Sequence, residues 1–106
     1  MTFIYLKMEV LEQVLGESPN TKSVNLEFLE IEDFDELIPC LTEFRKLEEI
    51  LLFGNRLTSL PRDLSILSKV KYLDISNNLV KNVDDIIDGL ASLPSLTHLS
   101  ITLASD

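Results

Sequence analysis

The stretch LEEILLFGNRL at residues 47–57 decides the fold, because its pattern of apolar residues returns elsewhere in the chain. The segment VKYLDISNNLV at residues 70–80 has the same spacing of four apolar residues and one asparagine, 23 residues later. Shorter matches begin at Leu26, 21 residues before the first stretch, and at Leu96, 26 residues after Val70. A pattern that returns at a nearly fixed period of about 20–50 residues predicts an array of stacked repeats.

Each copy contains a short segment in which apolar side chains alternate with others. Ile50 and Leu52 have one residue between them, and so do Leu73 and Ile75. Since successive side chains of a strand point to opposite faces, each pair lies on one face and the intervening residue lies on the other. We therefore expect about four short parallel strands, one per copy, whose apolar face packs against the segments that return from one strand to the next.

The two central copies resemble the consensus of the leucine-rich repeat family, Leu-x-x-Leu-x-Leu-x-x-Asn-x-Leu, and the resemblance covers about residues 24–103. The segment LTSLPRDLSIL at residues 57–67 is similar to the return segment of the typical cytoplasmic type. The resemblance implies an α/β fold, a right-handed solenoid in the form of a short horseshoe, with the parallel strands on its concave face. It also implies a structural role for Asn55 and Asn78, which in this family form a ladder that bonds backbone groups at the turns.

We expect one domain over residues 1–106, because a chain of this length has material for a single hydrophobic core. The copies divide it into four repeats, the last of them incomplete: residues 24–46, 47–69, 70–95 and 96–106. The sequence ends directly after the fourth expected strand. A truncation, a natural fragment of a longer array, or an end completed by a partner or a second copy would each explain this.

The first residues are expected to form a separate element. Between residues 1 and 19, apolar side chains recur every three or four positions, at Ile4, Met8, Leu11 and Leu15. This spacing predicts an amphipathic helix of about three turns. We interpret it as an N-terminal cap over the first repeat, since a solenoid exposes its core at an uncovered end; a free helix that docks onto another protein is the alternative.

The charge of the chain is strongly negative and unevenly distributed. The 106 residues include 18 acidic and nine Lys or Arg side chains, for a net charge of −9, and residues 1–49 alone account for −8. Six carboxylates fall within residues 27–36. Direct binding to nucleic acid is not expected, because Lys and Arg drive it. A basic partner surface is the natural complement; the alternative is that the carboxylates keep an exposed loop solvated.

Few side chains could perform chemistry. His98 is the only histidine and Cys40 the only cysteine, so we expect no zinc site and no disulfide within the chain. The three glycines form no phosphate-binding loop. The sequence therefore predicts no enzyme, no cofactor and no metal. Since it has no N-glycosylation sequon and no apolar run of about 20 residues, we expect an intracellular protein, in the cytoplasm or the nucleus, without membrane contact.

The strand residues between the buried ones are expected to face a partner on the concave surface. Counted from the first Leu or Val of each copy, they are Phe28, Glu30 and Glu32, then Glu49, Leu51 and Phe53, then Tyr72, Asp74 and Ser76, and finally His98. Four of them carry large apolar side chains: Phe28, Leu51, Phe53 and Tyr72. Exposed aromatic residues among charges are typical of binding hot spots. The alternatives are a cover formed by the acidic residues 32–36, or scattered surface residues.

These features favour a non-enzymatic scaffold or adaptor that binds another protein, apolar at its centre and basic at its rim, through the concave face. An acidic chaperone or inhibitor of basic proteins is a second hypothesis, although the long acidic tail usual in such proteins is absent from the sequence. A third is a structural subunit that self-associates or extends an array through the edge of its last strand.

Overall fold

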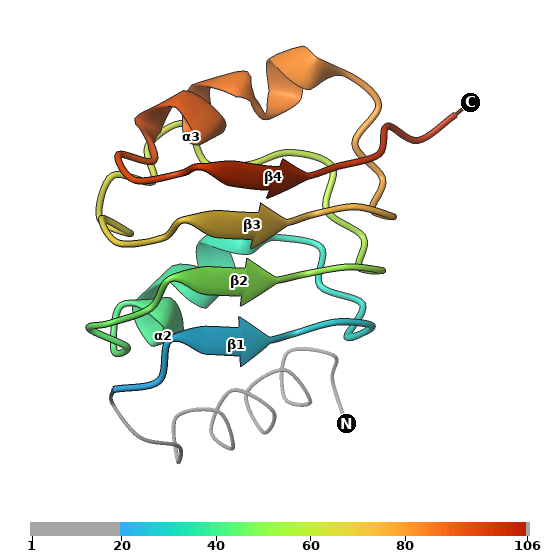
Figure 1. The fold of residues 1–106 in the computed structure, drawn as a ribbon. Helices are drawn as coiled ribbons and strands as arrows, with labels where there is room; N and C mark the ends of the chain where they lie inside the picture. Colours follow the sequence, from blue (N-terminus) through green and yellow to red (C-terminus); the bar gives the residue numbers. More distant parts are fainter. Residues whose placement is uncertain (1–19, 106) are drawn as a thin grey trace.

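The computed structural model describes residues 20–105, and in this part of the chain four short strands form one sheet. The strands are β1 (Ser23–Asn25), β2 (Glu49–Leu51), β3 (Tyr72–Asp74) and β4 (His98–Ser100). All are parallel, and each pairs with the next strand along the chain (Figure 1). The described residues thus form a small α/β domain with an all-parallel sheet. The helix predicted between residues 1 and 19 lies outside the described residues.

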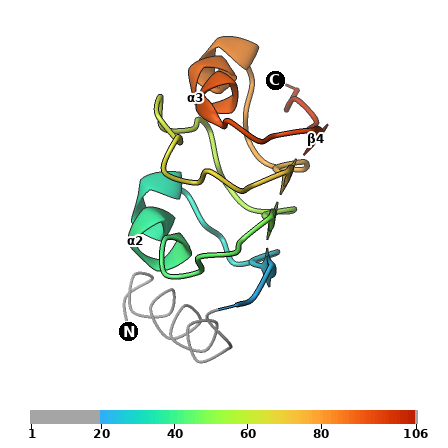
Figure 2. The same cartoon turned by 60° about the vertical axis from the view of Figure 1, so that its left-hand side comes forward.

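The segments that connect the strands run along one face of the sheet (Figure 2). After β1 the chain forms the 3-10 helix η1 (Phe34–Leu37) and the short helix α2 (Ile38–Leu41). After β3 it forms η2 (Val83–Asp85) and α3 (Ile87–Ser92), whereas the segment between β2 and β3 contains no helix. Because the return segments share one side, the opposite face of the sheet is left open along the described strands. We call it the open face.

The inner face of the sheet and the apolar sides of the return segments form a single core. Ile50 and Leu73, at the centres of β2 and β3, are at most 1% exposed, and Phe34 and Leu64 from the return segments belong to the same buried cluster. Burial of a side chain of this size stabilises the fold by about 1.5–3 kcal/mol. In the two central copies, the alternation of apolar and other residues therefore determines which face of the sheet packs in the core. Leu99 holds the equivalent place on β4 and is 39% exposed.

The first copy has a different register from the one expected. We predicted that Leu26 aligns with Leu47, 21 residues later, but Val24 lies opposite Ile50, so the offset is 26 residues and Leu26 aligns with Leu52. The prediction was wrong because two alternating pairs compete in this stretch, one at residues 24 and 26 and one at residues 29 and 31. Only the earlier pair belongs to the strand, since the chain turns immediately after it.

Left-handed backbone is the reason for that turn. Phe28 and Glu30 both have φ of 57°, a conformation that bulky side chains rarely adopt and that ends an extended segment. Neither residue type signals such a turn, whereas Gly54 (φ 75°) and Asn77 (φ 54°) at the corresponding bends are the usual choices. Phe28, Glu30 and Glu32, which we placed on the first strand, therefore lie beyond β1.

Asn55 and Asn78 bond the backbone at the ends of β2 and β3. The oxygen of Asn55 accepts from two N–H groups and its amide donates to two carbonyl groups, all at 2.8–3.0 Å; these belong to Leu29, Ile31, Leu26 and Leu52. Asn78 accepts from the N–H of Leu57 at 3.0 Å and donates to the carbonyl of Leu52 at 2.9 Å. Each asparagine thus joins its own turn to the preceding copy, and both are buried.

Candidate interaction surface

The strand pairing defines which residues occupy the open face. In the corrected register the paired positions on this face are Ser23 and Asn25 in β1, Glu49 and Leu51 in β2, Tyr72 and Asp74 in β3, and His98 and Ser100 in β4. Continuing the alternation by one position past each strand adds Glu27, Phe53, Ser76 and Thr102. Six of the predicted positions thus keep their place beside His98. The three from the first copy are replaced by small or polar side chains and Glu27, so the apolar residues of this face come from β2 and β3.

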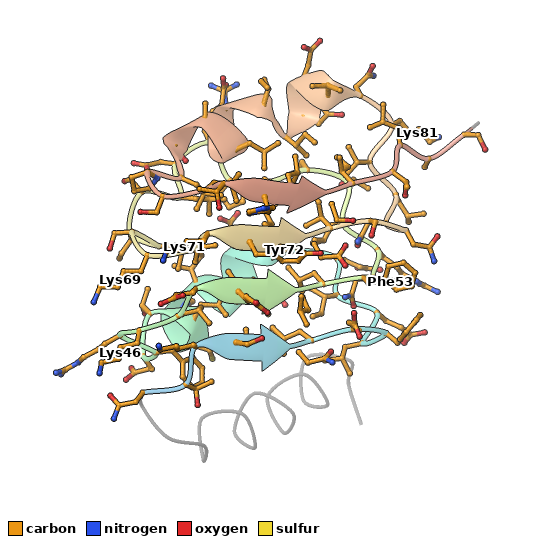
Figure 3. All side chains as sticks on the ribbon, in the orientation of Figure 1. Lys46, Phe53, Lys69, Lys71, Tyr72 and Lys81 are labelled. Carbon is orange, nitrogen blue, oxygen red and sulfur yellow. The ribbon has the colours of Figure 1, made fainter. Side chains whose placement is uncertain are left out.

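Three apolar side chains of the open face come from neighbouring copies: Leu51 in β2, Phe53 two residues after it, and Tyr72 in β3. Leu51, Phe53 and Tyr72 are half-buried, although no described return segment packs on this face (Figure 3). The ring of Tyr72 stacks on that of His98, with 6.4 Å between centroids and 28° between planes. These contacts hold the rings in place at little entropic cost, which suits side chains that contact a partner.

Phe28 joins this surface from the turn rather than from a strand. Its ring meets that of Phe53 edge to face, with centroids 5.4 Å apart. It is nevertheless 66% exposed, because residues 33–37 turn away into η1 and do not cover it. We define the apolar patch as Phe28, Leu51, Phe53 and Tyr72. The four residues proposed from the sequence all keep a place on or beside the open face, but Phe28 reaches it from a turn, which alternation does not reveal.

The polar residues of the open face are largely engaged within the chain. Ser76 is only 7% exposed, and its backbone N–H and hydroxyl donate to Asp74 at 2.9 and 2.5 Å. Ser76 is therefore occupied by hydrogen bonds within the chain, and we no longer count it among the partner-binding residues. Glu49 accepts a hydrogen bond from the hydroxyl of Ser23 at 3.1 Å and is exposed, so it can still reach a partner.

Charged side chains of both signs lie at the two ends of the strands, with Lys81 at the end opposite to Lys46 and Lys69 (Figure 3). Glu30 and Glu32 lie beyond the end of β1, where each is 3.9 Å from the guanidinium of Arg56. Lys46 and Lys69 lie at the edge where the strands begin (Figure 3). Glu30 lines the same groove as Phe28, and Glu32 shares the guanidinium of Arg56 with Glu30. A partner there meets negative charge.

The turns after β1, β2 and β3 enclose an open groove beside Phe28. Its volume is about 610 Å³, and it is lined by Phe28, Glu30, Gly54, Arg56, Asn77 and Leu79, with buried Asn55 at its base. Sequence reasoning missed Gly54, Arg56, Asn77 and Leu79, since none belongs to a strand. The signal that could have found them is the shared turn position of Gly54 and Asn77, two residues that favour left-handed backbone.

Reactive groups are few in the described region. Cys40 is in α2, on the return side, where burial raises the pKa of its thiol and the negative charge of Glu43 raises it further. His98 is on the open face, and its Nδ1 lies 2.9 Å from the hydroxyl of Thr97. Within residues 20–105, no three His, Cys, Asp or Glu side chains are grouped to hold a metal ion. The same residues contain no helix that is long and apolar enough to cross a membrane.

Comparisons with known proteins give no family for this chain. No protein-family model and no curated protein matches the sequence.

Proposed function

We propose that the chain is a leucine-rich repeat solenoid of the typical cytoplasmic type, and that it is a non-enzymatic adaptor. Three features support the family: strands that pair in chain order, offsets of 26, 23 and 26 residues between copies, and asparagines that bond successive turns. In such a solenoid the open face is the concave face. A lone Cys40 and the lack of a glycosylation sequon favour a location in the cytoplasm or the nucleus.

The observation that carries the binding function is the apolar patch. The rings of Phe28 and Phe53 contact each other and the ring of Tyr72 stacks on His98, on a face that the return segments do not use for packing. Aromatic side chains with few rotatable bonds contribute strongly when a partner removes them from water. Glu49 lies on the same face and Glu30 and Glu32 lie beyond β1, which favours a partner protein with an apolar centre and a basic rim.

The test compares the wild-type chain and two variants as baits in cell extract. Phe53→Ser with Tyr72→Ser removes two rings of the patch, and Ile66→Ser is the matched control, because Ile66 is an apolar residue of the return side that is 65% exposed. We expect the double variant to lose the proteins that the wild type and the control retain. Far-ultraviolet circular dichroism checks that all three fold alike.

Two outcomes contradict this proposal. Equal retention by the three baits would show that the open face is not the binding surface. Loss of all binding by the wild type at about 0.5 M salt would favour the acidic inhibitor of basic proteins, because screening removes charge–charge attraction but leaves an apolar interface intact.

A further inference from the structure

One turn position repeats along the sheet with an unusual occupant in the first copy. Phe28, Gly54 and Asn77 each follow the centre of their strand by four residues and have φ of 57°, 75° and 54°. Glycine and asparagine adopt this conformation readily, but a bulky residue does so at a cost in stability. The fold therefore holds a phenylalanine where its own pattern uses small or amide residues. Strain of this kind concentrates at functional sites.

Two neighbouring residues position the ring of Phe28. A Cβ atom added to Gly54 would lie 2.5 Å from the Phe28 ring, so the ring sits directly over the glycine backbone. Phe53 supports it from the side through the edge-to-face contact at 5.4 Å. Phe28 is nonetheless 66% exposed. The Phe28 ring is thus held by two contacts within the chain and is still largely exposed. Such a ring is preorganised to contact another molecule.

The groove next to this ring is lined by both apolar and polar groups. Leu79, which is 47% exposed, lines it together with Phe28, and Gly54 between them contributes no side chain. The backbone N–H of Asn77 donates to the hydroxyl of Thr102 at 2.9 Å, while its side-chain amide has no hydrogen-bond partner among residues 20–105. That amide can both donate to and accept from the backbone of a bound peptide.

We propose that this groove is the anchor site of the interface, and that it takes one large apolar side chain from a basic peptide segment of the partner. The inference rests on the proposed function and deepens it. The anchor packs against Phe28 and Leu79, and Asn77 bonds the peptide backbone. Lys or Arg residues beside the anchor meet Glu30 and Glu32, which are exposed and each lie 3.9 Å from Arg56. The partner thus crosses the open face and ends in the groove.

The probe for the test is an array of heptapeptides. The central residue is Phe, Leu or Ser, and the flanking residues are mixtures of Lys and Arg or of Asp and Glu. We expect the full chain to retain peptides with Phe or Leu between basic flanks, and to bind the Ser-centred peptides with the same flanks at least about tenfold more weakly. Preference for acidic flanks, or equal binding to Ser and Phe centres, would overturn the inference.

Two variants connect that binding to the groove. Phe28→Asn removes the ring but suits the left-handed backbone, so it should fold at least as well as the wild type while binding at least about tenfold more weakly. Leu79→Ser should weaken binding similarly, and the control Ile66→Ser should not. Unchanged binding by Phe28→Asn and Leu79→Ser contradicts the anchor site. If Phe53→Ser with Tyr72→Ser still abolishes binding in that case, the open face binds but the groove is not its anchor.

Discussion

The substitution Asn55→Ala tests how the turns of the sheet are held together. Asn55 follows β2 and is 4% exposed. Its side chain makes four hydrogen bonds to backbone groups, two as acceptor and two as donor. Alanine keeps the Cβ atom and removes all four bonds, so the expected effect on folding comes from the backbone groups that lose their partner.

The size of the effect follows from which groups are buried. The buried bonds to the N–H of Ile31 and the carbonyl of Leu26 are lost. The carbonyl of Leu52 keeps a second bond, donated by the amide of Asn78 at 2.9 Å. An unpaired buried backbone group costs about 1–3 kcal/mol, so two such groups predict a loss of about 4 kcal/mol. A domain of this size has a total stability of about 5–15 kcal/mol, so the variant should be only marginally folded.

Urea unfolding followed by circular dichroism measures this loss as the change in the free energy of unfolding. The matched control is Asn25→Ala. Asn25 is exposed, and its side chain accepts one hydrogen bond, from the N–H of Glu27 at 3.0 Å, so its loss should cost about 1 kcal/mol or less. A loss below about 1 kcal/mol for Asn55→Ala, or equal losses for the two variants, would refute the structural role of Asn55.

Three further predictions use other parts of the described chain. Gly89→Ala should lower the free energy of unfolding by about 1–3 kcal/mol in urea, although alanine is the better helix former, because the added Cβ would collide with the carbonyl oxygen of Pro61; a gain in stability would contradict this contact. The hydrogen bonds from the hydroxyl and N–H of Ser65 lower the pKa of Asp63, so its contribution to stability is present above about pH 4 and is lost as the pH falls through the lowered pKa. NMR titration should find the Asp63 pKa higher in Ser65→Ala, and an unchanged value would exclude this cause. Burial raises the pKa of the Cys40 thiol, so its reaction with a disulfide reagent at pH 7 should be slower than that of the unfolded chain in urea; an equal or faster rate would contradict it.

The sequence was sufficient to predict the strands where side-chain periodicity and backbone conformation agree. In the second and third copies, alternation around Ile50 and Leu73 identified the strands, their inner face and the neighbouring outward residues. These features are local consequences of burial on one face, which a single sequence records directly. The structural role of Asn55 and Asn78 was implied by the resemblance to leucine-rich repeats.

Sequence reasoning failed where backbone conformation departs from what residue types suggest. Phe28 and Glu30 gave no sign of left-handed backbone, so the first strand was placed too late in the chain. Ser76 was predicted to face a partner, but its hydrogen bonds to Asp74 fold it into a turn. The groove was missed because a missing side chain at Gly54 helps to form it, and strand periodicity contains no information about that space.

Binding through the open face is tested most directly by site-specific photocrosslinking. Tyr72→p-benzoylphenylalanine places the reactive group on the open face, and Ile66→p-benzoylphenylalanine places it on the return side, where residue 66 is 65% exposed. After irradiation with the proteins that the wild type retains, crosslinks should form from position 72 and not from position 66. Crosslinks from position 66 alone, or equal yields from both positions, would contradict binding through the open face.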